Sequence, residues 1–131
     1  MLAVSPYRFP PSLRLRTKAE FDRVFAHGCK AGDGLLLLFC APNSLGVTRL
    51  GVSVSRKLGS AVVRNRLKRW LREAFRHTYA DLPAGWDVVA VPTAVEQAGF
   101  AAYRDSLLRL TKKLQRKLAK SSPEMDSTRD E

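Results

Sequence analysis

The chain has 131 residues, a length typical of one domain, and 45% of its residues are hydrophobic, which is enough to build a core. Its formal net charge is +11, and the charge is uneven. Residues 1–120 carry 22 bases and 8 acids, whereas residues 121–131 carry one base and four acids. A domain this basic favours an anionic partner, which leaves RNA, DNA or an anionic membrane surface.

The sequence argues against a membrane-spanning protein and against a zinc site. The longest apolar run, Leu35–Ala41, has seven residues, whereas a bilayer span needs about 20. The N-terminus lacks the pattern of a signal peptide, so a cytoplasmic location is expected. Cys29 and Cys40 form no CxxC pair, and His27 and His77 are the only histidines, so a four-ligand zinc site is not expected.

The first predicted elements are an arm and a helix. Residues 1–12 are rich in proline and are expected to form a flexible N-terminal arm. Thr17 with Glu20 three residues later makes a capping-box pattern. This pattern predicts a helix from Lys18 to about His27 that ends at Gly28.

Two strand-like runs follow this helix. Leu35–Ala41 is a continuous apolar run, and Arg49–Ser55 alternates between apolar and small polar residues. Residues 43–46 form a turn signal between them, so the two runs are expected to pair as antiparallel neighbours. A third early strand could be hidden here if the first run is bent.

The second half predicts a helix, a strand and a helix. A basic helix is expected from about Ala61 to Thr78, a strand over Trp86–Val91 and a final helix from about Phe100 to Lys120. We therefore expect one domain over residues 13–120, with the α+β class of a two-layer sandwich in which helices pack on a small mixed sheet. Residues 121–131 are expected to be a disordered acidic tail.

The basic helix separates its apolar and basic side chains into two faces. At 100° per residue, an arc of about 140° holds one basic set and its neighbouring amide: Arg64, Asn65, Lys68, Arg69, Arg72 and Arg76. The opposite arc holds Val63, Leu67, Trp70, Leu71, Ala74 and Phe75. Arg66 lies outside the basic arc. Such a helix can pack on a core while it binds phosphates, which arginine contacts with two parallel hydrogen bonds.

A solvated charged face is the alternative interpretation of this helix. Between Arg56 and Arg76, however, the chain has eight Lys/Arg and one acid, Glu73. Surface helices usually intersperse acids among their bases, so this density favours anion binding.

The segment GVSVSRKLGSAVVRNRLKRWLREAF strongly resembles the signature of the bacterial ribonuclease P protein component. This family is the small basic subunit that assists a catalytic RNA in removing the 5′ leader of precursor tRNA. The resemblance extends over roughly residues 13–118 and implies a left-handed βαβ crossover, whereas right-handed crossovers dominate in general. It implies that the catalytic RNA is bound by Arg56, Lys57, Arg64, Asn65, Arg66, Lys68, Arg69 and Arg72. The acidic tail is not part of the family pattern.

The resemblance also implies a cleft between the first helix and the sheet that receives the leader. Phe21, Phe25 and Phe39 match its aromatic residues, where bases can stack with little sequence preference. The cleft set is completed by Arg14, Arg16, Lys18 and Ser53. Ordinary core packing is the alternative role for the three rings.

The chain offers no catalytic constellation of its own. Its acids have no metal-binding spacing, and no serine, cysteine or lysine lies in a nucleophile motif. The resemblance implies that the RNA carries the chemistry, with Mg²⁺ held mainly by RNA and substrate phosphates. The partners are then the catalytic RNA and precursor tRNA, and no obligate protein partner is evident.

Two other functions agree with the composition and charge. One is a ribosomal-type structural RNA-binding protein. Only the signature segment and the three aromatic residues distinguish this chain from such a protein. The other is a DNA-binding protein that lays the basic helix in the major groove, which the lack of a helix-turn-helix or dimerisation heptad disfavours.

Overall fold

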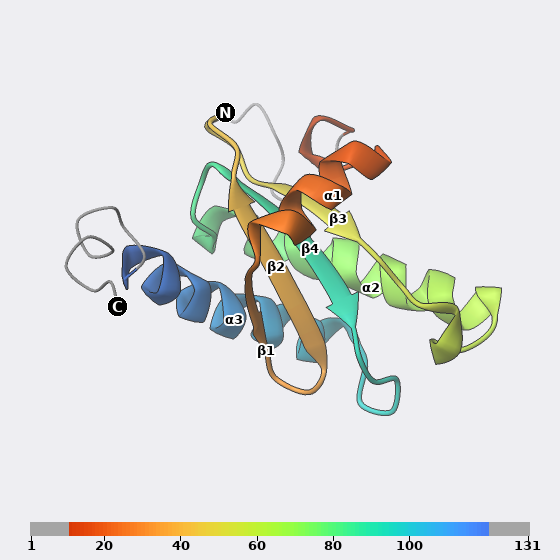
Figure 1. The fold of residues 1–131 in the computed structure, drawn as a ribbon. Coiled ribbons are helices and arrows are strands. Elements are labelled where there is room, and N and C mark those ends of the chain that lie inside the picture. The colour runs from red at the N-terminus through yellow and green to blue at the C-terminus, as the bar shows by residue number, and fades with distance from the viewer. Residues whose placement is uncertain (1–10, 121–131) are drawn as a thin grey trace.

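The computed structural model describes residues 11–120, with side chains through residue 118, so most of the predicted arm and the predicted acidic tail lie outside the described residues. In chain order the elements are α1 (Lys18–His27), β1 (Cys29–Gly32), β2 (Leu36–Pro42), β3 (Arg49–Val52), α2 (Ala61–Thr78), β4 (Trp86–Pro92) and α3 (Phe100–Lys120). Short 3₁₀ turns lie at Pro11–Leu13, Arg56–Leu58 and Tyr79–Asp81. Figure 1 shows the four strands as one twisted sheet. No helix of the described part of the chain is both long and apolar enough to cross a membrane.

The sheet has the order β1-β2-β4-β3 and is mixed. β2 runs antiparallel to both β1 and β4, while β3 runs parallel to β4. A βαβ crossover, which the resemblance implies, is therefore present as β3-α2-β4. The left hand of this crossover stays a prediction.

The predicted pairing of the two early strands is wrong, because β4 lies between β2 and β3. The physical reason is the burial of β4, whose first five residues, from Trp86 to Ala90, are all buried. A strand that is buried on both faces gains most from a central position, where it has a neighbour on each side. The additional early strand is β1, which precedes the first apolar run instead of lying within it.

The ends of α1 follow the predicted capping box. The Thr17 hydroxyl accepts a hydrogen bond from the Glu20 backbone N–H at 3.1 Å, and the Glu20 carboxylate accepts one from the Thr17 N–H at 3.0 Å. Gly28 ends the helix with a φ of 82°, a left-handed conformation that suits glycine. A cap of this kind stabilises a helix by about 1 kcal/mol and fixes where α1 starts.

The main core lies between the sheet and the pair α2 and α3, which cover the same face (Figure 1). The predicted apolar side of α2 is confirmed, since α2 buries Leu67, Leu71, Ala74 and Phe75. From α3 the core receives Tyr103, Leu107, Leu110 and Leu114. The basic side of α2 is thereby turned away from the core.

Among the helices of residues 11–120, α1 is the one that lies on the opposite face of the sheet (Figure 1). A small cluster lies there, in which Leu15, Val24, Ala41 and Val89 are buried. Other side chains of this face, including Leu37, Phe39 and Val91, stay half-buried. One helix cannot cover four strands, so part of this sheet face remains accessible.

Candidate nucleic-acid interface

The basic side of α2 is a surface of cations without counter-ions. Seven of the predicted RNA-binding residues on α2 and the turn before it are basic: Arg56, Lys57, Arg64, Arg66, Lys68, Arg69 and Arg72. The eighth predicted residue, Asn65, is exposed among them. Among the described residues, none of the seven forms a salt bridge. We call these seven residues the α2 surface. Arg76, by contrast, pairs with Glu73 at 2.8 Å, so it is partly neutralised.

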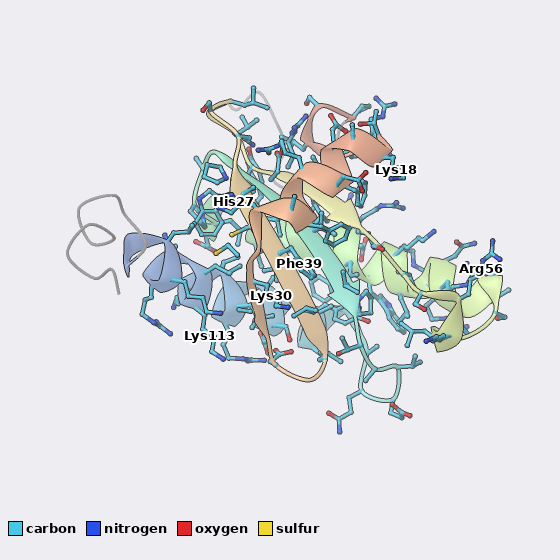
Figure 2. All side chains as sticks on the ribbon, viewed as in Figure 1. Lys18, His27, Lys30, Phe39, Arg56 and Lys113 are labelled. Atoms are coloured by element: carbon cyan, nitrogen blue, oxygen red, sulfur yellow. The ribbon has the colours of Figure 1, made fainter. Side chains whose placement is uncertain are left out.

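The loop before α2 is held in a defined shape. The Ser55 hydroxyl accepts from the Lys57 N–H at 3.1 Å, and the Ser60 hydroxyl caps α2 by accepting from the Val63 N–H at 3.3 Å. A Cβ added at Gly59, whose φ is 147°, would lie 3.1 Å from the Val63 side chain, so the turn needs glycine. These contacts place Arg56 and Lys57 at the start of α2, and Figure 2 shows Arg56 at this end of the molecule.

Arg14, which the resemblance groups with the leader-binding cleft, lies beside the α2 surface. A hollow of about 280 Å³ is lined by Arg14, Arg69, Arg72, Glu73 and Arg76. Partial burial and the nearby Arg14 guanidinium lower the pKa of Arg72, so like charges converge here. An anion in this hollow would relieve that repulsion.

Three predicted phenylalanines gather around α1. The Phe25 and Phe39 rings meet edge to face with centroids 4.8 Å apart, and Phe25 is 37% exposed. Phe21 lies against the backbone of β3, since a Cβ added at Gly51 would lie 2.7 Å from its ring. The Lys30 ammonium lies 5.9 Å from the Phe39 ring centroid (Figure 2). The rings are therefore both packed and accessible, which is compatible with base stacking.

The other predicted leader-binding residues differ in their position and in their partners. Ser53 is half-buried and follows β3 on the same face as Gly51, toward α1. Arg16 is exposed next to the start of α1. Lys18 is exposed but pairs with Asp22 at 2.7 Å, so its charge is partly compensated. The structure thus brings Ser53 and the rings to one side of the sheet, with Arg16 and Lys18 at its rim.

A buried ion-pair network that the sequence analysis did not identify fixes α1 on the sheet. Asp87 of β4 is fully buried and accepts hydrogen bonds from Arg23 of α1, Arg49 of β3 and Asn43. Burial alone would raise the pKa of Asp87, but the hydrogen bonds from Arg49, Asn43 and Arg23 outweigh it and lower this pKa. An acid inside an otherwise apolar strand was the available signal, because a buried charge needs partners.

The described side chains do not assemble a metal site. Among residues 11–118, no group of three or more His, Cys, Asp or Glu could hold a metal ion. The two acids that approach the interior already have cationic partners, Asp87 with Arg23 and Arg49, and Asp33 with Arg109 at 2.6 Å. What the described residues do assemble here is a surface of cations without counter-ions.

Known proteins resemble this chain in sequence and in fold. A family model described as Ribonuclease P matches residues 9–115. The chain is 40% identical over 101 residues to the ribonuclease P protein component of Caldanaerobacter subterraneus subsp. tengcongensis, which covers 76% of this chain and 87% of that protein.

Two solved structures are similar in fold over most of the chain. The ribonuclease P protein from Thermotoga maritima has a TM-score of 0.70 and 35% identity, over 76% of this chain and 96% of that one. The Staphylococcus aureus ribonuclease P protein has a TM-score of 0.68 and 27% identity, over 77% of this chain and 94% of that one.

Proposed function

Because the chain belongs to the ribonuclease P protein family, we propose that its α2 surface binds the catalytic RNA of that enzyme and that its aromatic face holds the 5′ leader of precursor tRNA. The chain is then the protein subunit of an endoribonuclease that produces the mature 5′ end of tRNA. The alternative of a ribosomal-type protein would use the same charges but would have no need for the accessible rings.

The observation that carries this proposal is the set of uncompensated cations on the α2 surface. Glu73, the one acid of α2, is already paired with Arg76 on the same helix. Cations without counter-ions contribute most when they neutralise phosphates, because binding then releases the condensed counter-ions of the RNA. The hollow beside Arg14 and Arg72 supplies a point where several guanidinium groups can share one phosphate.

The leader assignment is supported by the accessible rings. Phe25 and Phe39 lie on the partly open face of the sheet, with the Lys30 ammonium beside them to contact a phosphate. A single strand that crosses this face would stack bases on the rings and would need no particular sequence.

The chemistry is assigned to the RNA. The described carboxylates do not fit a Mg²⁺ site, and no nucleophile motif is present, so we propose that Mg²⁺ is held by RNA and substrate phosphates. The protein's own residues bind, orient and screen charge. We place the complex in the cytoplasm, where RNA polymers of this kind are made and processed in bacteria.

The salt dependence of RNA binding tests the α2 assignment. In Arg64→Ala, Arg66→Ala and Lys68→Ala, the slope of log K against log salt for the catalytic RNA should fall by about 0.7–0.9 per lost phosphate contact. Arg104→Ala is the matched control, since it removes the same charge from a residue that pairs with Asp105 on α3. Unchanged slopes in all three α2 variants would overturn the assignment.

A further inference from the structure

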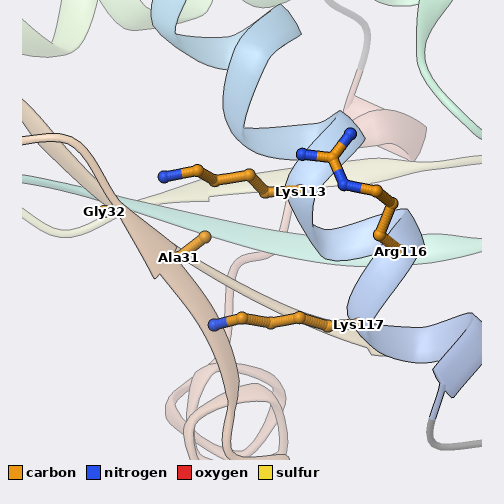
Figure 3. Close-up of a pocket in the computed structure, with 5 residues that line it drawn as sticks. All are labelled: Ala31, Gly32, Lys113, Arg116 and Lys117. Carbon is orange, nitrogen blue, oxygen red and sulfur yellow. The ribbon is translucent and has the colours of Figure 1, made fainter.

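A second basic surface lies where α3 meets β1, outside every site described above. Lys112, Lys113, Arg116 and Lys117 project from α3, and we call these four residues the α3–β1 patch. Figure 3 shows Lys113 and Lys117 extending toward β1 on either side of Ala31, with Arg116 beside them on α3.

The four cations share one side of the helix. They fall within an arc of about 140° and a rise of about 7.5 Å along the helix axis. Two adjoining hollows follow them, one of about 330 Å³ against Ala31 and Gly32 and one of about 420 Å³ on the other side. Lys113 and Arg116 line both hollows, so they form the ridge between them.

The acids nearest to the patch already have partners. Asp33 accepts hydrogen bonds from Arg109 and Ser106, and Asp105 pairs with Arg104. Within the part of the chain whose side chains are described, Lys112, Lys113 and Arg116 form no ion pair. Lys117 donates to the Lys30 carbonyl on β1, which fixes the patch against the edge of the sheet.

The patch and the α2 surface lie toward opposite edges of the sheet. α3 packs over β1, whereas α2 packs over β3, and these two strands are the opposite edges of the sheet. Three strand spacings of about 4.8 Å separate the edges, before any side chain is counted. Figure 2 shows Lys113 and Arg56 at distant ends of the structure. One short run of phosphates cannot contact both surfaces.

The residue types that line the patch indicate which kind of ligand it can bind. No aromatic side chain lines either hollow, so stacking on unpaired bases is not available as it is near Phe39. The large apolar side chains that are exposed in the described part of the chain, Phe25, Leu45 and Val62, all lie outside α3, so the patch has no apolar anchor for a membrane. Asp105 lines the second hollow but is already paired with Arg104, so the charge left over is positive. Such a surface fits a sugar–phosphate backbone, which double-helical RNA presents on its outside.

We propose that the α3–β1 patch binds the backbone of a second, double-helical segment of the same catalytic RNA, so that the protein bridges two RNA segments. This inference rests on the proposed function of the α2 surface. Two linked contacts strengthen each other through effective concentration, so the loss of either one lowers the affinity of the whole complex.

The test compares the triple variant Lys112→Ala/Lys113→Ala/Arg116→Ala with the charge-conserving K112R/K113R/R116K and with Arg64→Ala/Lys68→Ala. We expect the alanine triple variant to lose about two to three units of salt slope with the catalytic RNA, and to bind a plain 20-base-pair RNA duplex more weakly. The charge-conserving variant should retain both. In hydroxyl-radical footprints, the α3 and α2 variants should each lose protection at a different RNA segment.

The outcomes separate this inference from the function on which it rests. If the α3 triple variant keeps its slope while the α2 variant loses slope, the patch is not an RNA contact and the proposed function stands. If neither variant loses slope, both proposals fail. Loss of protection at one common segment would contradict bridging, and loss of binding only to vesicles of 30% anionic lipid would identify a membrane contact instead. A thermal melt of each variant confirms that it is folded.

Discussion

Arg49 holds the buried carboxylate of Asp87 with two hydrogen bonds, from Nε to Oδ1 at 2.8 Å and from Nη2 to Oδ2 at 2.7 Å. This pair joins the two parallel strands, and Arg23 of α1 donates to the same carboxylate at 2.6 Å. The position of α1, and with it that of Phe21 and Phe25, therefore depends on one acid in β4.

Asp87→Asn should destabilise the protein by about 2–4 kcal/mol. Removing one member of a buried ion pair typically costs 3–5 kcal/mol, and the cost is reduced here because Arg23 is half exposed and asparagine keeps one acceptor. Denaturant unfolding measures the change. Asp22→Asn is the matched control, because it breaks an exposed pair with Lys18 and should change stability by less than about 0.5 kcal/mol. Equal stability of both variants would show that the ion pairs of Asp87 do not contribute to the free energy of unfolding.

Asp33 gives the fold a defined acid dependence. Burial opposes its charge, but hydrogen bonds from Leu36, Ser106, Arg109 and Leu35 lower its pKa from 3.8 to about 2. Because the folded pKa lies below the unfolded one, the carboxylate stabilises the fold above about pH 4, and this contribution is lost as the pH falls toward 2.

The measurement is the difference in unfolding free energy between the wild type and Asp33→Asn. This difference should shrink by about 1 kcal/mol between pH 5 and pH 3, following the linkage relation. A difference that does not change with pH would mean that Asp33 titrates normally in the folded protein. Asp105→Asn serves as the control, because its carboxylate is exposed next to Arg104.

The aromatic face makes a prediction about substrates. Phe25→Ala should weaken binding of leader-bearing precursor tRNA to the assembled enzyme by roughly 5- to 160-fold, since a stacked base contributes about 1–3 kcal/mol. Mature tRNA should be affected little. Phe25 suits this test better than Phe21, because Phe21 packs on Gly51 and its loss also removes core contacts.

Phe25→Leu separates stacking from packing, because leucine keeps apolar volume without a ring. It should lose most of the leader-dependent affinity while its melting temperature stays near that of the wild type. An equal loss for both RNAs in a folded variant would make the ring a structural residue only.

Local signals in the sequence were sufficient for the helices. Thr17 and Glu20 predicted the start of α1, and the separation of apolar and basic residues predicted both the bounds of α2 and its outward basic side. These features depend on residues within one or two turns of each other, so they can be read without knowledge of the fold.

The arrangement of the strands depended on contacts that the sequence does not display. β1 has four residues without a clear alternation, and it forms because β2 offers it an edge. The central place of β4 follows from its burial on both faces. In the candidate site, Arg14 lies next to the α2 surface because its backbone runs alongside β3, where the Leu15 N–H donates to the Leu50 carbonyl. Such placements arise between distant segments, and periodicity within a segment does not predict them.

Reconstitution tests most directly the claim that the protein assists a catalytic RNA and does not cleave by itself. Purified protein, a bacterial ribonuclease P RNA and a precursor tRNA are combined, and 5′ leader removal is measured as Mg²⁺ is lowered and monovalent salt is raised. The account predicts that the protein alone cleaves nothing, and that it allows the RNA to cleave at Mg²⁺ and salt concentrations where the RNA alone is inactive. Metal-dependent cleavage by RNA-free protein, or no effect of the protein on the Mg²⁺ requirement of the RNA, would contradict it.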